Sequence, residues 1–204
     1  MKNRFVVVVR LGVLLGVSMG WSMSGVASTD GAALYADCAA CHGKDGGGVA
    51  DAAVPAIAGQ PASLIEKQLE AFRSARRQDL RMQHFSDAEH LADAAAVRAV
   101  AAYVASLTRS TPAGVGPGDN LAAAERRFAA SCAGCHGLKA SPNELTAVPG
   151  LAGQHYGYLR GKLEQVAAGR SHLAASHARL LQRSSPSERD ALADYLARLP
   201  TVIN

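Results

Sequence analysis

An internal duplication constrains the fold of this chain more than any other feature. The six residues Cys-Ala-Ala-Cys-His-Gly that begin at Cys38 return as Cys-Ala-Gly-Cys-His-Gly at Cys132, 94 positions later. At the same displacement, Val-Pro-Ala-Ile-Ala-Gly-Gln from Val54 returns as Val-Pro-Gly-Leu-Ala-Gly-Gln from Val148. Weaker matches pair Leu69 with Leu163, Arg76 with Arg170, and the Tyr-x-x-x-Leu segment at Tyr103 with that at Tyr195. Chance does not explain this series, so the chain consists of one structural unit written twice.

A stretch rich in proline and glycine separates the two copies at residues 110–118. Such residues interrupt both helices and strands, which favours a linker. We therefore predict a first domain over residues 28–110, a linker over 111–118 and a second domain over 119–204. With 49% hydrophobic and 19% charged residues, the composition is typical of globular domains.

The first 27 residues have the order of a secretory signal peptide. Three basic residues precede an apolar run from Leu11 to Met19, and Gly25-Val26-Ala27 fits a cleavage site. The alternative is an uncleaved membrane anchor, which needs about 20 apolar residues and therefore a longer run. Cleavage would take the net charge from +4 to +1 and leave no basic stripe for nucleic acid. We predict an exported protein with no integral membrane span after cleavage.

Helical signals recur in both halves, and no segment shows the sustained alternation of a strand. We predict an all-α fold of two tandem small helical domains related by duplication. Four cysteines are also too few for a disulfide framework in a chain of this length. The expected helices are 61–74; a long helix opened by the capping box of Ser86 and Glu89 and ending near Leu107; Leu121–Ala133, capped by Asp119; 156–168; and a last helix opened by Ser185, Pro186 and Glu188.

The repeated cysteine motif carries the chemistry. A Cys-x-x-Cys pair fits a redox dithiol, half a zinc site or a covalent haem attachment, and a following histidine favours the haem. Two thiols on one helical turn can form thioethers with the two vinyl groups of a haem, and the next imidazole can then bind the iron. A zinc site shared by both pairs would leave both histidines unexplained, and a dithiol enzyme would need a strand–helix context. We predict two covalently bound haem c groups, attached to Cys38, Cys41, Cys132 and Cys135, with His42 and His136 as axial iron ligands.

These motifs resemble those of the two-haem cytochromes c4, which contain two class I cytochrome c domains. The resemblance covers essentially the whole chain after the leader. It implies that each domain folds around one haem, whose iron binds the motif histidine on one side and a methionine from a later loop on the other. It also implies that the carbonyls of Pro55 and Pro149 accept the second N–H of each motif histidine. The family carries electrons between periplasmic or membrane-bound partners, including terminal oxidases.

The sixth iron ligand of the first domain is predicted from the methionine count. The chain has four methionines, and three of them precede residue 28. The fourth, Met82, lies in the loop where the family places its axial methionine. We predict Met82 as the ligand, with His84 as its rival.

The second domain has no methionine, so its sixth ligand must differ from that of the family. The displacement of 94 places Ser176 opposite Met82, and His177 follows it. Serine binds haem iron poorly, whereas imidazole binds it readily. We predict His177 as the ligand; His172 and an iron without a second protein ligand are the alternatives. A His–Met haem would then have a higher reduction potential than a His–His haem.

Two remaining histidines receive no metal role. His90 is expected at the surface and His155 at the start of a helix, neither beside other metal ligands. Four arginines near the Met82 loop are expected in solvent, where they could also steer an acidic partner: Arg73, Arg76, Arg77 and Arg81.

The leading functional prediction is a periplasmic, non-catalytic carrier of single electrons between redox proteins, such as a membrane-bound oxidase or dehydrogenase. One alternative is an electron-relay subunit of an oxidoreductase complex. A further alternative is a haem peroxidase or ligand-binding protein that uses an open second haem. The two-haem peroxidases share only the cysteine motifs with this chain and are longer.

Overall fold

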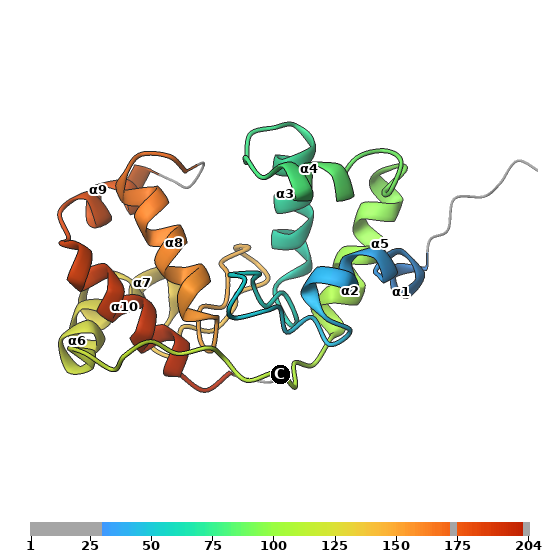
Figure 1. The fold of residues 1–204 in the computed structure, drawn as a ribbon. Helices are drawn as coiled ribbons and strands as arrows, with labels where there is room; N and C mark the ends of the chain where they lie inside the picture. The colour runs from blue at the N-terminus through green and yellow to red at the C-terminus, as the bar shows by residue number, and fades with distance from the viewer. Residues whose placement is uncertain (1–29, 172–174, 202–204) are drawn as a thin grey trace, which may run out of the picture.

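Two helical units lie side by side, and the chain segment that joins them runs along one edge of the molecule (Figure 1). The computed structural model describes residues 30–171 and 175–201, so the predicted leader and His172 lie outside the described residues. The described part contains helices and no strand, which confirms the all-α prediction. The first unit contains α1 (Gly31–Leu34), α2 (Ala36–His42), α3 (Ala62–Arg73), α4 (Leu80–Phe85) and α5 (Ala94–Ser106); the second contains α6 (Leu121–Ser131), α7 (Ala133–His136), α8 (Tyr156–Ala167), α9 (Ala175–Gln182) and α10 (Pro186–Arg198).

The last helix of each unit forms the centre of that unit's core. In the first unit α5 packs against α1 and α3, and in the second α10 packs against α6 and α8. An aromatic pair joins the first and last helical segments of each unit: Tyr35 with Tyr103, at 5.4 Å between ring centres, and Phe128 with Tyr195, at 6.0 Å. In both copies, therefore, the same kind of aromatic contact joins the first and last helical segments.

The loop that follows each cysteine motif also repeats in detail. An isolated antiparallel bridge joins Val49 to Val54, and its counterpart joins Asn143 to Val148, each residue displaced by 94. Gly43 and Gly137 both have positive φ angles, of 77° and 69°. The duplication read from the sequence is thus a duplication of backbone conformation.

The predicted helix starts are confirmed in part. The middle helices and the capping box at Ser185 agree with α3, α8 and α10. The capping box at Ser86 is wrong: α5 begins at Ala94, and the Asp93 carboxylate accepts the amides of its first turn. Ser86 is buried and ends α4 instead, and its carbonyl accepts a hydrogen bond from Arg73.

The predicted cap of the helix that precedes the second cysteine motif is also wrong. Asn120, rather than Asp119, is the N-cap residue of α6, and its φ of 55° places it in the left-handed region. Asparagine tolerates that region better than most residues, so the tight turn out of the linker selects it. The helix then breaks at Cys132, and the short α7 carries Cys135 and His136.

The proline- and glycine-rich stretch between the units is held at both ends by buried or half-buried carboxylates. Asp45 of the first unit accepts hydrogen bonds from the backbone and hydroxyl groups of Ser110 and Thr111, at 2.7–3.0 Å. Asp194 of the second unit accepts the amides of Gly116 and Gly118 at 2.8 and 2.6 Å. The linker is therefore held against both units by hydrogen bonds. We refer to residues 110–118 as the strap.

His155 holds the middle of this strap. The residue precedes α8 as predicted, but its side chain is fully buried. Its Nδ1 accepts the amide of Gly114 at 3.0 Å, so the proton is on Nε2, which donates to the carbonyl of Gly47 at 2.7 Å. Burial lowers the pKa of His155, which favours this neutral form. A residue without a predicted role thus joins the linker to both units.

Candidate haem sites

The cysteines of the first motif lie on one face of α2. Cys38 and Cys41 are three residues apart, so their side chains project from the same side of the helix. Cys38 is half-buried, Cys41 is exposed, and neither forms a disulfide. Burial raises the pKa of Cys38 to about 11, and it also raises the pKa of Cys132 in the second motif. Such thiols stay protonated at neutral pH, unlike the activated thiolates of dithiol enzymes.

The motif histidines are buried and oriented by the same contact in both units. The Nδ1 atom of His42 lies 3.0 Å from the carbonyl oxygen of Pro55, and that of His136 lies 3.2 Å from the oxygen of Pro149. Because a carbonyl only accepts, Nδ1 carries the proton and leaves Nε2 free to bind a metal. Burial lowers the pKa of both imidazoles, which keeps them neutral and ready to act as ligands.

In the second unit, α9 places a further histidine opposite His136. The ring centres of His136 and His177 are 6.2 Å apart, and the two rings are inclined by 76°. Two imidazoles that bind one metal ion from opposite sides, with metal–nitrogen bonds of about 2.0–2.1 Å, have ring centres about 6.3 Å apart. The Nδ1 of His177 is buried and has no hydrogen-bond partner among the described residues. The distance between the two ring centres is thus the one that an iron ion bound between them would require.

In the first unit, Met82 lies half-buried on α4. The Asp79 carboxylate caps this helix and accepts the amide of Met82 at 3.2 Å, which fixes the backbone of the residue. The rival His84 has a side chain that is 58% exposed, and its Nδ1 lies 3.5 Å from the Asp87 carboxylate. Met82 is thus the more buried of the two candidates, and the His84 ring lies beside a carboxylate.

His84, Asp87 and His90 form a cluster whose possible ligand atoms lie within 4.8 Å of one another. The expectation that His90 has no metal-ligand neighbours is therefore wrong. Asp87 accounts for the cluster without a metal, because its carboxylate accepts the His90 amide and lies 2.9 Å from His90 Nδ1. The hydrogen bond to Asp87 also raises the pKa of His90. At a displacement of 94 the second copy has Ala178, Leu181 and Ser184, so the cluster is not part of the repeated haem unit.

The arginines near the Met82 loop divide into structural and exposed residues. Arg73 donates to the carbonyls of Ser86 and Leu91, and Arg77 donates to the hydroxyl group of Tyr158 in the second unit. The Arg81 side chain is 72% exposed. Steering of an acidic partner would therefore depend on exposed residues such as Arg81 rather than on Arg73 or Arg77.

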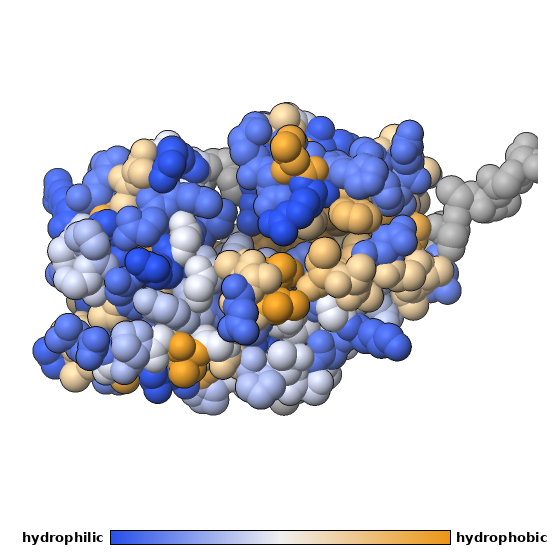
Figure 2. Space-filling view, in the orientation of Figure 1, coloured by the Kyte–Doolittle hydropathy of each residue, from blue (hydrophilic) through white to orange (hydrophobic). Residues whose placement is uncertain are grey.

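The surface near α4 also has an apolar component. Leu80, two residues before Met82, is 83% exposed. Figure 2 shows apolar residues gathered over the first unit and the middle of this face, whereas the second unit is mainly hydrophilic in this view. In the described part of the chain, every helix is too short or too polar to cross a bilayer.

Comparison with known proteins agrees with this geometry. The cytochrome c family profile matches the chain twice, at residues 28–108 and 121–200. A curated relative from Stutzerimonas stutzeri (strain A1501), named thiosulfate dehydrogenase electron acceptor, is 34% identical over 211 residues, which cover 89% of this chain and 96% of the relative.

Solved structures show the same arrangement. Reduced recombinant cytochrome c4 from Pseudomonas stutzeri has a TM-score of 0.71 and 26% identity, and the match covers 83% of this chain and 97% of that one. Cytochrome c4 from Acidithiobacillus ferrooxidans has a TM-score of 0.67 and 25% identity, with 80% and 99% covered. A thiosulfate dehydrogenase (TsdBA) from Marichromatium purpuratum has a TM-score of 0.70 and 30% identity; the match covers 80% of this chain but only 36% of that protein.

Two family matches, two Cys-x-x-Cys-His motifs and two units of the same fold lead to one assignment. The chain belongs to the cytochrome c family, and it is a two-haem electron carrier of the cytochrome c4 type with one haem c bound covalently in each domain.

Proposed function

We propose that this cytochrome works in the periplasm with two chemically different haems, one ligated by His42 and Met82 and the other by His136 and His177. The 6.2 Å separation between the rings of His136 and His177 carries this proposal. Cys38, Cys41, Cys132 and Cys135 would hold the haems through thioether bonds. Each haem supplies the one-electron chemistry of its iron, and the protein supplies the axial ligands.

The buried Nδ1 of His177 supports its assignment over a structural role. A buried imidazole that only filled space would normally have a hydrogen-bond partner. Iron bound at this nitrogen would give Nδ1 the partner that packing does not supply. His172 remains the alternative, and it lies outside the described residues.

Burial likewise supports Met82 over His84. Axial ligands must lie beneath the protein surface where the haem iron is enclosed, and Met82 is the more buried of the two. His84 is directed to Asp87 and forms a cluster with His90.

The two ligand sets would give the domains different potentials. A thioether ligand favours the ferrous state more than an imidazole does, so the first haem would have the higher potential. At half reduction the electron would therefore reside mainly in the first domain, and the second domain would pass electrons to it.

A dehydrogenase that oxidises thiosulfate is the proposed electron donor. This follows from the curated relative, whose match covers nearly the full length of both proteins. Leu80 and Arg81, both exposed on α4, offer an apolar and a basic contact for the protein that takes electrons from the first haem.

Electron paramagnetic resonance and near-infrared magnetic circular dichroism of the oxidised protein test the ligands. We expect one His–Met and one His–His low-spin haem. His177→Ala should make the second haem high-spin, whereas the control His172→Ala should leave it low-spin. Met82→Leu should remove the His–Met signal, and the control His84→Ala should retain it. A high-spin haem in the unsubstituted protein, or in a control variant alone, contradicts the assignment.

Stopped-flow spectroscopy tests the donor separately. A thiosulfate dehydrogenase supplied with thiosulfate should reduce both haems. When the supply of electrons is limited, the His–Met haem should be the more reduced of the two at equilibrium. The same mixture without thiosulfate is the control. Absence of reduction would exclude this donor and leave the ligand assignment untouched.

A further inference from the structure

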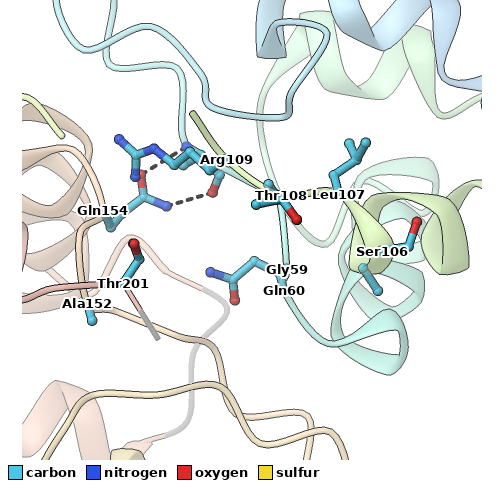
Figure 3. A pocket seen from close by; sticks show the side chains of 12 residues that line it. Gly59, Gln60, Ser106, Leu107, Thr108, Arg109, Ala152, Gln154 and Thr201 are labelled. Atoms are coloured by element: carbon cyan, nitrogen blue, oxygen red, sulfur yellow. Dashed lines mark hydrogen bonds between the residues drawn. The ribbon is translucent and has the colours of Figure 1, made fainter. Parts of the chain in front are cut away.

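Two glutamines form matched contacts across the boundary between the domains. Gln154 of the second domain donates to the carbonyl of Ala56 at 2.7 Å and accepts the amide of Ala56 at 3.0 Å. Gln60 of the first domain donates to the carbonyl of Gly150 at 2.9 Å and accepts the amide of Gly150 at 3.0 Å. Figure 3 shows Gln154 and Gln60 beside the cavity at this boundary, with the hydrogen bonds of Gln154 dashed. Each glutamine side chain thus forms two hydrogen bonds with the backbone of one residue of the opposite domain.

The peptide groups that donate to the two glutamines are the same groups that orient the motif histidines. The peptide between Pro55 and Ala56 accepts the His42 Nδ1–H at its oxygen and donates its N–H to Gln154. The peptide between Pro149 and Gly150 does the same between His136 and Gln60. One planar group therefore links each axial histidine to a side chain of the other domain.

Burial makes this link effective. Gln154 is 6% exposed and Ala56 is 7% exposed, so water does not compete readily for the bond between them. Gln60 is half-buried, and its bond is more open to solvent. A peptide that donates at its nitrogen becomes a better acceptor at its oxygen, because hydrogen bonds in series polarise one another.

We propose that each glutamine tunes the haem of the opposite domain: Gln154 acts on the first haem through His42, and Gln60 acts on the second haem through His136. A stronger Nδ1–H···O bond makes the imidazole a more basic ligand, which stabilises the ferric state and lowers the potential. The glutamines are positioning residues, since they act only through the peptide and the histidine. The proposal rests on His42 and His136 as axial ligands, as proposed above.

The experiment is a spectroelectrochemical titration of the full haem-loaded chain, with the two haems resolved. Gln154→Met keeps the side-chain length but removes both the N–H donor and the carbonyl acceptor of the side chain. It should raise the potential of the first haem and leave the second unchanged. Gln60→Met should raise the potential of the second haem alone, and by less, because this site is more exposed.

A second readout separates tuning from loosened domain contact. In the reduced protein, the proton resonance of His42 Nδ1 should move upfield in Gln154→Met, as expected for a weaker hydrogen bond. The control Glu144→Ala also weakens the boundary, because Glu144 accepts the amides of Ala62 and Ser63 across it, yet it touches neither peptide. It should leave both Nδ1 resonances in place.

Three results would overturn the proposal. The first is a shift in potential only for the haem in the same domain as the substituted glutamine, and the second is an equal shift for both haems. The third is a change in the potentials by Glu144→Ala that is as large as the change caused by the glutamine variants. The ring-current shifts of the other His42 protons report iron ligation by themselves. Their absence would refute the ligand assignment rather than the role of the glutamines.

Discussion

Asp194 offers the sharpest test of how the linker is held. Its side chain is 1% exposed, and its two oxygens accept the amides of Gly116 and Gly118. Arg198 also donates to it, at 2.8 Å. A Cβ atom at Gly116 would lie 2.9 Å from the Asp194 carboxyl carbon, so the amide reaches the carboxylate only because residue 116 is a glycine. Asp194→Ala should therefore release the strap and destabilise the second domain.

The size of the effect follows from these contacts. A hydrogen bond to a charged group stabilises a protein by about 1.5–3 kcal/mol, so two backbone donors left without an acceptor should cost about 3–5 kcal/mol at pH 7. Arg198 adds little, because its side chain is 38% exposed and water can replace the carboxylate. Asp194→Asn retains one acceptor oxygen and should cost roughly half as much.

Guanidinium denaturation of the full haem-loaded chain, followed by circular dichroism, measures the free energy of unfolding. Asp190→Ala is the matched control on the same helix, because Asp190 pairs with the exposed Arg160 and its loss should cost less than about 1 kcal/mol. If Asp194→Ala were no more destabilising than Asp190→Ala, the strap would not contribute to stability and the reasoning would fail.

The pH dependence of Asp194 gives a second check. Burial raises its pKa, but the hydrogen bonds from Arg198, Gly118 and Gly116 together lower it below the usual range. The folded protein therefore holds the charged form more strongly than the unfolded chain does. This stabilisation should be present above a pH of about 4 and decline as the pH falls further. The difference in unfolding free energy between the unsubstituted protein and Asp194→Asn should shrink in parallel.

Two further predictions concern the first domain. Hydrogen bonds, led by that from the Ser110 hydroxyl, lower the pKa of Asp45, so Asp45→Asn should flatten the loss of unfolding free energy on acidification below a pH of about 4; identical pH curves would contradict this role. Gly31→Ala should destabilise the chain by about 1–3 kcal/mol in the same denaturation assay, because the new Cβ would lie 2.2 Å from the carbonyl oxygen of Ala99. The control Gly134→Ala, where nothing lies within 4 Å, should be neutral or stabilising, and equal effects of the two would refute the steric argument.

Local patterns in the sequence predicted the repeated features well. The Cys-x-x-Cys-His motifs, the middle helices and the Ser185 capping box each depend on residues close together in the chain, and the duplication supplied a second copy to compare. The absence of a methionine from the second domain also predicts His177 as a ligand, and this remains a prediction. Where a local pattern had a competitor, as at Ser86, the prediction failed, because Arg73 and the α4 turn already hold that residue.

The sequence by itself thus determined the two helical haem units and their covalent attachment, since these follow from residues within single turns and from the repeat. Only the tertiary structure decided how the units are joined. The contacts of Asp45, His155 and Asp194 with the linker, and of Gln60 and Gln154 with the opposite domain, join residues 41–98 positions apart. The final glutamine of the repeated Val-Pro-x-x-Ala-Gly-Gln segment was visible as a pattern, but a repeat cannot reveal its partner. That partner depends on how two preformed units dock, which is fixed by long-range packing and hydrogen bonding and not by any local periodicity.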